Sequence, residues 1–442
     1  MNARGRDTFS TALPPLLLLV LFSLLVFPPI FAGAGGTGAE LDQDTAHLPQ
    51  IDHFVRHPRD WLDYEAKTAT TPGHHVVLAG VARLLGVESV TAETRGVRIA
   101  NALFGHALLL FVWLVMYRVS GSPWRAVLFA LPVACSSYVQ AASIWIVTDN
   151  GALLFYAAAL WMALGPETRP RPGLRAVLAG LAATLMVWWR QMYLPVVGAA
   201  GLCAMPSSGG LGRRVRYLVP MLGPLLVMAL YAREWGGITP PVMSHYARVE
   251  PAVPLHALAL VGLFGFAYGP YLAGGFSSAW RSEMRALPRG TLGRVTLVAA
   301  LLAVPGLWYA AATTYDEPAG RWGSLVWVLA RKTPVLGDRS PAVLVLALLG
   351  GAILVLMAVR AARTRPFPTE FLFLVLYLAG YSAQPYAWQR YIEPQVMVTF
   401  GALCLREPIP PRWTWLGPAG MALLFAALAQ ARFWGAVPQL FG

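Results

Sequence analysis

The sequence predicts an all-α, polytopic integral membrane protein with about thirteen transmembrane helices. Only 12% of its 442 residues are charged, and the mean hydropathy is +0.56, whereas soluble domains carry roughly a quarter charged residues. Apolar runs of membrane-spanning length recur along the chain, and one span needs about 20 residues. In a bilayer such runs have to be helices, because a helix satisfies its own backbone hydrogen bonds.

The positions of the spans follow from hydropathy and from the arginines between them. The fourth, fifth, sixth and twelfth spans are short, and the two that meet at Trp189–Arg190 are open to being half-helices. We expect spans near residues 11–32, 97–117, 124–145, 149–164, 174–189, 192–206, 217–233, 254–275, 295–312, 341–359, 370–385, 391–405 and 414–431.

The first apolar run has two interpretations. Its basic start, MNARGR, and the small residues FAGAGG that follow it are similar to a signal peptide with a cleavage site. The apolar stretch is longer than the usual signal core of about 7–15 residues, and this favours an uncleaved first span.

The distribution of charge predicts which face each loop occupies. With the N-terminus in the cytoplasm, the cytoplasmic segments hold 19 of the 34 Lys and Arg but only 5 of the 21 Asp and Glu. This asymmetry is the positive-inside bias of membrane proteins. The opposite, non-cytoplasmic face then collects five polar segments: LDQDTAHLPQIDHF, WWRQ, WGGITPP, TTYDEPAGR and YAWQRYIEP.

The domain organisation is predicted to be simple, with one transmembrane domain over residues 1–442 and a long first non-cytoplasmic loop at 33–96. Apolar pieces of this loop, such as GHHVVLAGVARLLG, are too short to span, so we expect interfacial helices there. Within it, TTPG at Thr70–Gly73 is typical of a helix start, with Thr71 as the cap and Pro72 in the first turn.

Composition argues against several other classes of protein. The net charge of +13 comes mainly from arginines in short loops between spans, which membrane topology explains without a nucleic-acid partner. Cys135, Cys203 and Cys404 lie in or beside apolar runs, and the sequence has no CxxC motif and no Cys/His cluster. We therefore expect neither a disulfide framework nor a zinc site.

The polar segments resemble those of a known family. HLPQIDHF with TTPGHH further on is similar to the first luminal loop of the dolichyl-phosphate-glucose-dependent α-1,2-glucosyltransferases, and Trp61 and Asp63 lie where that family has W-D. WWRQMYLP resembles its R-Q-T-N segment, and WGGI at Trp235–Ile238 resembles its W-x-G-G-I. These matches follow the family's order and cover about a tenth of the chain.

The chain also departs from this family. The family's acidic pair aligns with Gln43 and Asp44, so its first acid is an amide here, and the phenylalanine before its histidine is Ala46. Only Ser244 and His245 match its G-D-x-S-x-H segment. The departures concern the acceptor and the donor sugar, while the wider GT-C superfamily of polyprenyl-phosphate-sugar glycosyltransferases still fits.

The resemblance implies a GT-C-like fold and an activity. The expected protein is an inverting glycosyltransferase that moves a hexose from a polyprenyl-phosphate donor to a lipid-linked or cell-envelope glycan acceptor on the non-cytoplasmic face, glucose being the family's sugar. Its partners would be this donor, the acceptor and membrane lipids, with no nucleic acid. Neither a cofactor nor a metal is expected.

Such a transfer needs a base for the acceptor hydroxyl. The first loop supplies the carboxylates Glu40, Asp42 and Asp44. We predict Asp44 as the base, because it aligns with the family's acidic pair and lies three residues before His47. Asp42 is the alternative, since this alignment can slip by one or two residues. The other interpretation is that all three are solvated loop acids.

The transfer also needs cations for the departing phosphate. Arg190 and Arg390 are the candidates, because a guanidinium matches phosphate oxygens and both lie at span ends; QRYIEP, which contains Arg390, also resembles the R-Y element of many superfamily members. His47, one helical turn from Asp44 on the expected helix face, is a third candidate. The alternatives are arginines that reach lipid headgroups and a packed histidine. The residues predicted to bind substrate are Gln50, Gln191, Trp235 and Tyr391.

A polytopic secondary transporter or a flippase is the alternative from another class. Transporters often carry ionisable groups or broken helices near the membrane midplane. Here the predicted span interiors are nearly free of charge and the polar segments lie at one interface, which favours an enzyme. Frequent Ala, Arg and Pro with almost no Lys indicate a GC-rich bacterium. We therefore expect the bacterial inner membrane with a periplasmic active site; the alternative is the endoplasmic reticulum with a luminal one.

Overall fold

The computed structural model of the chain describes residues 3–35, 38–62, 68–164, 172–205, 210–246, 249–276, 290, 294, 313–318, 321, 323–363, 368–406 and 415–434. These residues form helices, turns and two isolated β-bridges. The chain divides into two compact units: Met1–Ala247 with Ala422–Gln439 is unit 1, and Arg248–Met421 with Leu440–Gly442 is unit 2. A single domain over 1–442 stays a prediction.

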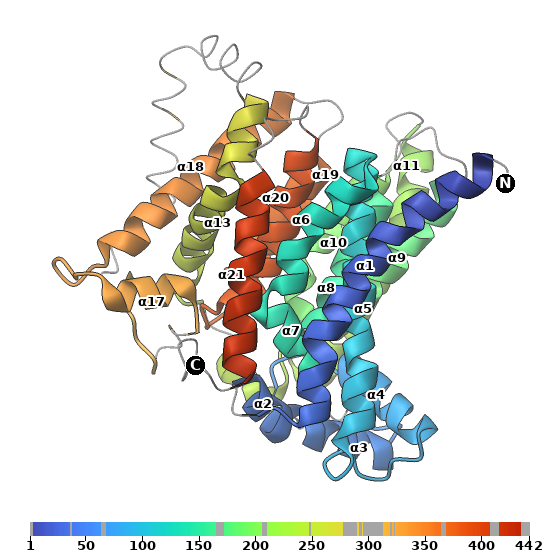
Figure 1. The fold of residues 1–442 in the computed structure, drawn as a ribbon. Helices are drawn as coiled ribbons and strands as arrows, with labels where there is room; N and C mark the ends of the chain where they lie inside the picture. The colour runs from blue at the N-terminus through green and yellow to red at the C-terminus, as the bar shows by residue number, and fades with distance from the viewer. Residues whose placement is uncertain are drawn as a thin grey trace. The chain divides into compact units, whose positions relative to one another are not determined.

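Unit 1 contains the first predicted spans and the long loop between them. Its short helices α2, α3 and α4 gather at one end of the long helices α1 and α5 (Figure 1). The elements are α1 (Ala3–Ala32), α2 (Gly38–Asp42), η1 (Gln43–His47), α3 (Leu48–Arg56), α4 (Gly73–Leu84), α5 (Thr94–Ser120), α6 (Pro123–Cys135), α7 (Ser137–Ile144), α8 (Asp149–Ala163), α9 (Pro172–Trp189), η2 (Gln191–Tyr193), α10 (Val196–Ala204), α11 (Leu211–Leu218), η3 (Val219–Met221), α12 (Leu222–Trp235), η4 (Pro241–Tyr246) and residues 422–433 of α21 (Leu416–Phe433).

The turn between α5 and α6 is set by local sequence. α5 ends where Gly121 takes a left-handed conformation with φ of 63°, which glycine adopts without steric cost. Ser122 then accepts a hydrogen bond from the backbone N of Arg125, and Pro123 occupies the first turn of α6. A serine cap followed by proline is a typical helix start.

The third predicted span is broken. α6 and α7 are bent by 66°, and Ser136 at the break accepts a hydrogen bond from the backbone N of Val139. The carbonyls of Ala134 and Cys135 accept hydrogen bonds from Gln140 Nε2 at 3.3 and 3.0 Å. A side-chain donor therefore replaces helical bonds lost at the break, as a low-dielectric bilayer requires.

Small residues allow the helices of unit 1 to approach closely. A Cβ atom at Gly105 of α5 would lie 2.2 Å from Ser143 Oγ and 3.0 Å from Phe22 Cε1. Glycine at this position therefore lets α1 and α7 pack directly against α5, as is common between membrane helices. Asn101 adds a polar contact here, because its Nδ2 donates to the carbonyls of Ala142 and Trp145.

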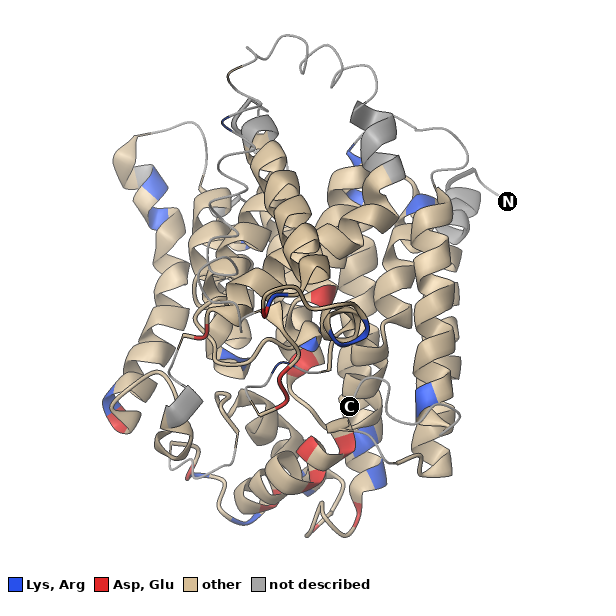
Figure 2. Cartoon of the chain, turned by 90° about the vertical axis from the view of Figure 1, so that its left-hand side faces the viewer, with Lys and Arg blue, Asp and Glu red and all other residues tan. Residues whose placement is uncertain are grey.

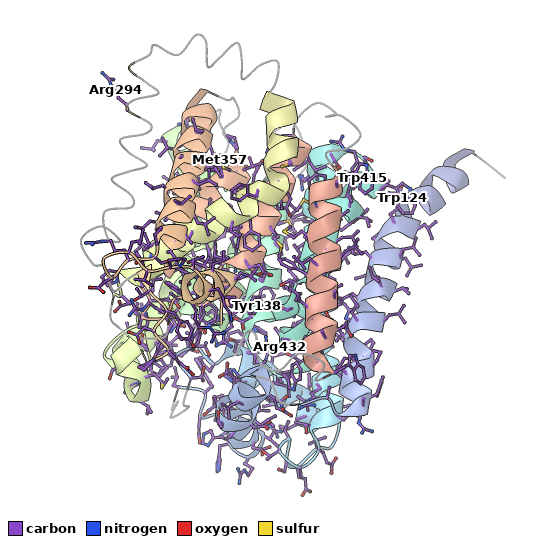
Figure 3. The ribbon with its side chains drawn as sticks, turned by 60° about the vertical axis from the view of Figure 1, so that its left-hand side comes forward. Trp124, Tyr138, Arg294, Met357, Trp415 and Arg432 are labelled. Atoms are coloured by element: carbon purple, nitrogen blue, oxygen red, sulfur yellow. The ribbon has the colours of Figure 1, made fainter. Side chains whose placement is uncertain are left out.

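The last part of α21 completes unit 1. Gln430 Nε2 donates to Gln140 Oε1 at 3.0 Å and to the carbonyl of Leu25 at 3.2 Å. The ring of Phe433 packs edge-on against Trp145 with centroids 5.3 Å apart. In Figure 3 its neighbour Arg432 and the exposed Trp124 of α6 lie toward opposite ends of this unit.

Unit 2 is built around a close helix crossing. A Cβ atom at Gly262 of α13 would lie 2.1 Å from the carbonyl oxygen of Leu346, and one at Gly350 of α18 would lie 1.8 Å from that of Leu258. The backbones of these two helices therefore touch. The elements are α13 (Ala252–Phe276), α17 (Leu325–Lys332), α18 (Pro341–Arg363), α19 (Thr369–Tyr381), η6 (Gln389–Tyr391), α20 (Glu393–Leu405) and the first turns of α21.

An ion pair between a buried carboxylate and an exposed arginine joins α19 to the end of α20. The guanidinium of Arg406 contacts both carboxylate oxygens of Glu370, with Nη2 donating to Oε2 at 2.9 Å, and Glu370 is fully buried. The pair explains how the carboxylate of Glu370 can lie inside an apolar helix.

Six helices of the described residues are long and apolar enough to span a membrane, and a seventh span is present if the bent pair counts as one. The predicted all-α membrane fold is thereby confirmed in the described part of the chain. The number thirteen stays a prediction, and the span expected at 295–312 lies outside the described residues. The spanning helices are Thr11–Ala32, Thr94–Ser120, Arg214–Trp235, Ala252–Gly269, Pro341–Ala358 and Leu416–Phe433.

The first loop is helical, as predicted. α3 has nine residues and α4 has twelve, so neither can cross a bilayer. Leu48, Ile51 and Phe54 of α3 are buried in one cluster with Leu78 and other residues of α4. Acidic residues of unit 1 gather at the end that carries these helices (red in Figure 2). The position of α3 and α4 on the membrane surface stays a prediction.

Cysteine labelling tests the predicted topology. Cysteines at the exposed positions Glu88 and Ser244 are expected to react with an impermeant thiol reagent from the non-cytoplasmic side, while one at the exposed Gly210 is expected to be protected. The measurement is labelling of intact cells and of inverted vesicles, in a background where the half-buried Cys203 is serine. Labelling of all three from one side would contradict the topology.

Candidate active site

The segment with the predicted base forms one continuous helical path with a wide turn inside it. Gln43–His47 is a π-helical turn between α2 and α3, and the residues that flank it, Asp42 and Leu48, keep helical dihedral angles. π-turns are rare, and they are frequent at functional sites. The turn buries Gln43 and His47 and leaves Asp44 exposed.

Asp44 is held by its neighbour. Gln43 Nε2 donates to Asp44 Oδ1 at 2.8 Å, and within the described part of the chain this is the one hydrogen bond of the Asp44 side chain. Arg98, in the first turns of α5, lies within electrostatic reach of Asp44 and of Glu40. Glu40 and Asp42 are half-buried, and both have further interactions of their own. The structure therefore leaves Asp44 as the most open of the three acids.

His47 does not share a face with Asp44, contrary to the expectation from the sequence. It is buried, and its Nδ1 lies 2.8 Å from His75 Nε2, with the two rings stacked at 5.1 Å. The reason is the π-turn, whose i→i+5 spacing makes three residues less than one turn. His47 thus joins the predicted catalytic turn to α4.

The two histidines that begin α4 are buried together. Trp189 Nε1 donates to His74 Nδ1 at 3.1 Å, so the neutral ring carries its proton on Nε2, which has no partner among the described residues. Burial lowers the pKa of His75 to about 3. Burial is also the main cause that lowers the pKa of His74 well below 6.5, followed by the nearby His75 and Arg190.

These histidines make the fold sensitive to acid. Because their pKa values are lowered on folding, the unfolded chain binds more protons than the folded chain below about pH 6.5. Their contribution to stability is complete above that pH and is lost as the pH falls toward 3. We expect the thermal unfolding midpoint in detergent to decrease as the pH is lowered from 7.5 to 5, and to decrease less in His75→Gln. The exposed His57 supplies the control: His57→Gln should keep the wild-type slope, and an unchanged slope in His75→Gln would contradict the assignment.

The TTPG segment packs directly on the end of α9. A Cβ atom at Gly73 would lie 2.5 Å from the carbonyl oxygen of Trp188, so only glycine fits. Thr71 was expected to cap α4, and this was wrong: the N-cap is Pro72, and the Thr71 hydroxyl donates to the carbonyl of Val187 at 2.9 Å. Gln191 Nε2 donates to the carbonyl of Ala69, the residue directly before this segment. Two distant predicted motifs therefore form one structure.

Arg190 pairs with an acid that the sequence analysis did not select. Its Nη1 donates to Asp149 Oδ1, and the side chains of Arg190 and Asp149 are 9% and 20% exposed. Asp149 begins α8, where a carboxylate is favoured by the helix dipole. A Cβ atom at Gly151 in the same turn would lie 2.1 Å from Trp189 Nε1. The sequence did offer a signal for Asp149, because it is an acid at the non-cytoplasmic end of a predicted span.

Two other predicted substrate residues of unit 1 have packed positions. Trp235 stacks on Tyr231 at 4.4 Å, and its Nε1 donates to the carbonyl of Leu62 at 3.2 Å. Gln50 is 6% exposed, and its Nε2 has no partner within the described residues. Asp63, the other half of the W-D match, and the side chain of His245 lie outside what the structure describes.

The late segment with Arg390 belongs to unit 2. Its guanidinium carbon lies 4.5 Å from the ring centroid of Trp388 and 4.9 Å from that of Tyr391, and Arg390 Nη2 donates to Tyr391 Oη at 3.0 Å. Glu393, at the start of α20, accepts a hydrogen bond from Gln389. Two aromatic faces thus fix this arginine.

A buried network holds the turn that carries Arg390. Gln389 Oε1 accepts from Ser324 Oγ at 3.0 Å and from the backbone N of Leu325 at 2.7 Å. Ser324 Oγ also lies 2.8 Å from His256 Nε2, whose ring stacks on Trp327 at 5.2 Å. η6 is therefore tied to α13 and α17.

No protein-family model and no curated protein sequence matches the chain. Solved structures similar to it include ArnT from Cupriavidus metallidurans in the apo state, at 18% identity and a TM-score of 0.37 over 87% of this chain and 77% of that one. The same protein bound to undecaprenyl phosphate is 16% identical, with a TM-score of 0.37 over 94% of this chain and 78% of that one. The Archaeoglobus fulgidus oligosaccharyltransferase in complex with Zn and sulfate is 15% identical, with a TM-score of 0.43 over 95% of this chain and 53% of that one. These values are too low to assign a fold family or a function.

Proposed function

We propose that this chain is an inverting, GT-C-type glycosyltransferase that moves a hexose from a polyprenyl-phosphate donor to a lipid-linked or cell-envelope glycan acceptor. The supporting observation is that three segments of the family resemblance converge in unit 1. His47 of HLPQ contacts His75 of TTPGHH, Thr71 bonds the end of α9, and Gln191 of WWRQ bonds the carbonyl of Ala69, directly before TTPG. Segments more than 100 residues apart are thereby linked, through TTPGHH, to the turn that carries an exposed carboxylate.

In the proposed reaction Asp44 acts as the general base. The acceptor hydroxyl oxygen attacks the anomeric carbon and gives its proton to the Asp44 carboxylate. The bond between that carbon and the phosphate oxygen breaks, and its electron pair leaves with the polyprenyl phosphate from the opposite face of the sugar. The configuration is inverted in this single displacement. Asp42 is the alternative base.

The departing phosphate is assigned to arginines. Arg190 of unit 1 and Arg390 of unit 2 are each proposed as a cation that stabilises the negative charge developing on the phosphate oxygens. Arg190 is paired with Asp149, and this ion pair would hold its guanidinium in place for phosphate binding. Gln50, Gln191, Trp235 and Tyr391 are the proposed sugar and acceptor contacts, and no metal is part of the proposal. The proposed location is the periplasmic face of a bacterial inner membrane, with the luminal face of the endoplasmic reticulum as the alternative.

The broken span α6–α7 is the observation that favours a transporter or flippase, since such proteins often use discontinuous helices. The carbonyls at this break are, however, engaged by Gln140, and the side chains that form hydrogen bonds near it, Gln140, Ser143 and Asn150, are amides and a hydroxyl. The enzyme is therefore the better supported function.

A donor panel tests the proposal. Purified protein in nanodiscs is incubated with polyprenyl-phosphate-linked glucose, other hexoses and a pentose, and released polyprenyl phosphate is measured by mass spectrometry. We expect release from at least one hexose donor. Transfer of intact lipid-linked sugar across proteoliposomes without cleavage would support the flippase instead.

A further inference from the structure

Gln43 is a buried side chain that joins three elements of unit 1. Its Oε1 accepts hydrogen bonds from Arg98 Nε of α5 and from the backbone N of Ile146 after α7, both at 3.0 Å. Its Nε2 donates to Asp44 Oδ1 at 2.8 Å, and the residue is 1% exposed. The side chain thus connects an exposed acid to a rigid interior.

The orientation of this amide is determined by chemistry. Two N–H groups point at one end of the amide, and only its oxygen can accept from them. The NH2 group must therefore be the end that faces Asp44. A flipped amide would place donors against donors and leave a carboxylate oxygen beside a carbonyl oxygen, so the observed arrangement is the satisfied one.

The arrangement has a consequence for Asp44. Its Oδ1 is taken by Gln43, whereas its Oδ2 accepts no hydrogen bond from the described residues, so one oxygen is available for an incoming hydroxyl. An exposed carboxylate alone would sample several rotamers. The oxygen of a general base has to lie about 2.6–3.2 Å from the hydroxyl oxygen whose proton it removes, which requires one defined position.

We propose that Gln43 is the positioning residue of Asp44: its amide, anchored by Arg98 and the Ile146 backbone, fixes the carboxylate that removes the acceptor proton. This inference rests on the proposed function. It also explains why an amide stands where the resembling family has an acid, since a donor is needed at this place. The other charged or titratable groups around the turn are Glu40 and Asp42 on α2, Arg98 on α5, His47 within the turn and His75 on α4.

Gln43→Glu tests the proposal. The variant keeps the acceptor for Arg98 and Ile146, so the chain should fold, but it replaces the donor by a carboxylate at the same distance from Asp44. Two carboxylates so close share a proton. We expect kcat at high pH to be reduced by about 10- to 100-fold, because the two charged carboxylates repel and no donor holds Asp44, with the acid limb of the kcat/KM profile shifted upward by about one unit or more.

Thr45→Glu is the matched control. It adds the same charge on the other side of Asp44, at an exposed position whose hydroxyl bonds the carbonyl of Leu41. Its acid limb should stay near that of the wild type, because an exposed charge is screened. A shift equal to that of Gln43→Glu would show a general charge effect and would overturn the inference.

Gln43→Asn gives an independent measurement. Its shorter amide can no longer reach both Asp44 and its anchors, so kcat should fall by about 10- to 100-fold with an unchanged KM for the donor. Thermal unfolding identifies a variant that does not fold. If either Gln43→Glu or Gln43→Asn fails to fold, the kinetics of the remaining variant test the inference. Wild-type kcat in Gln43→Asn, or a wild-type profile in Gln43→Glu, overturns the inference alone. A wild-type protein that releases no polyprenyl phosphate from any donor overturns the proposed function, and the inference with it.

Discussion

Asp44→Asn is expected to reduce turnover by about 10²–10⁴-fold, while folding and donor binding persist. The amide keeps the shape of the side chain and an oxygen that can accept from Gln43 Nε2, but it cannot take a proton. The measurement is the rate of polyprenyl phosphate release at saturating donor, together with the thermal unfolding midpoint.

Asp42→Asn and Glu88→Gln are the controls for this prediction. Asp42 is half-buried with interactions of its own, so its loss should be milder; Glu88 is an exposed acid of the same loop and should be neutral. An inactive Asp42→Asn beside an active Asp44→Asn would mean that the alignment with the family has slipped by two residues. Two active variants would remove the carboxylate from the mechanism.

Arg190→Ala is expected to weaken use of the donor by about 2–5 kcal/mol, the usual cost of removing a charge-assisted contact to a partly buried phosphate. Arg190→Lys should not restore full activity, because the planar fork is lost. The measurement is the KM for the donor and kcat/KM in each variant. Arg390→Ala is expected to act in the same direction.

The ion pair with Asp149 makes a sharp control available. If Arg190 is only a structural partner, Asp149→Asn and Arg190→Ala should lower the unfolding midpoint and leave donor kinetics unchanged. If Arg190 binds phosphate, Arg190→Ala should raise the KM for the donor, and Asp149→Asn, which removes the carboxylate that holds the guanidinium in place, should raise it less. A wild-type KM in both Arg190→Ala and Arg390→Ala would make these arginines anchors for lipid headgroups.

Much of the fold could be predicted from the sequence because membrane spans are read from composition alone. Helices occur at twelve of the thirteen predicted positions, and the remaining one, 295–312, lies outside the described residues. The break at Ser136 was missed, since it depends on a serine cap and on Gln140, neither of which changes hydropathy. The π-turn at Gln43–His47 was missed because it, too, has no signature in the hydropathy of the chain.

The site was predictable to the level of segments and not of contacts. That the first loop, TTPG and WWRQ share one region followed from topology and from the resemblance. The partners did not: Asp149 for Arg190, His75 for His47, and Arg98 behind Gln43 are tertiary neighbours with no spacing rule in the chain. The predicted roles of Asp44, Asp42, Arg190, Arg390 and His47 stay predictions.

The most direct test of the account compares wild type and Asp44→Asn on one lipid-linked donor with its acceptor present. Sugar transferred and polyprenyl phosphate released are counted in the same sample, and the anomeric configuration of the product is read by NMR. The account predicts one polyprenyl phosphate released per sugar transferred, with inversion, in the wild type, and donor bound but uncleaved in Asp44→Asn. Equal release by both proteins, or retention of configuration, would contradict it.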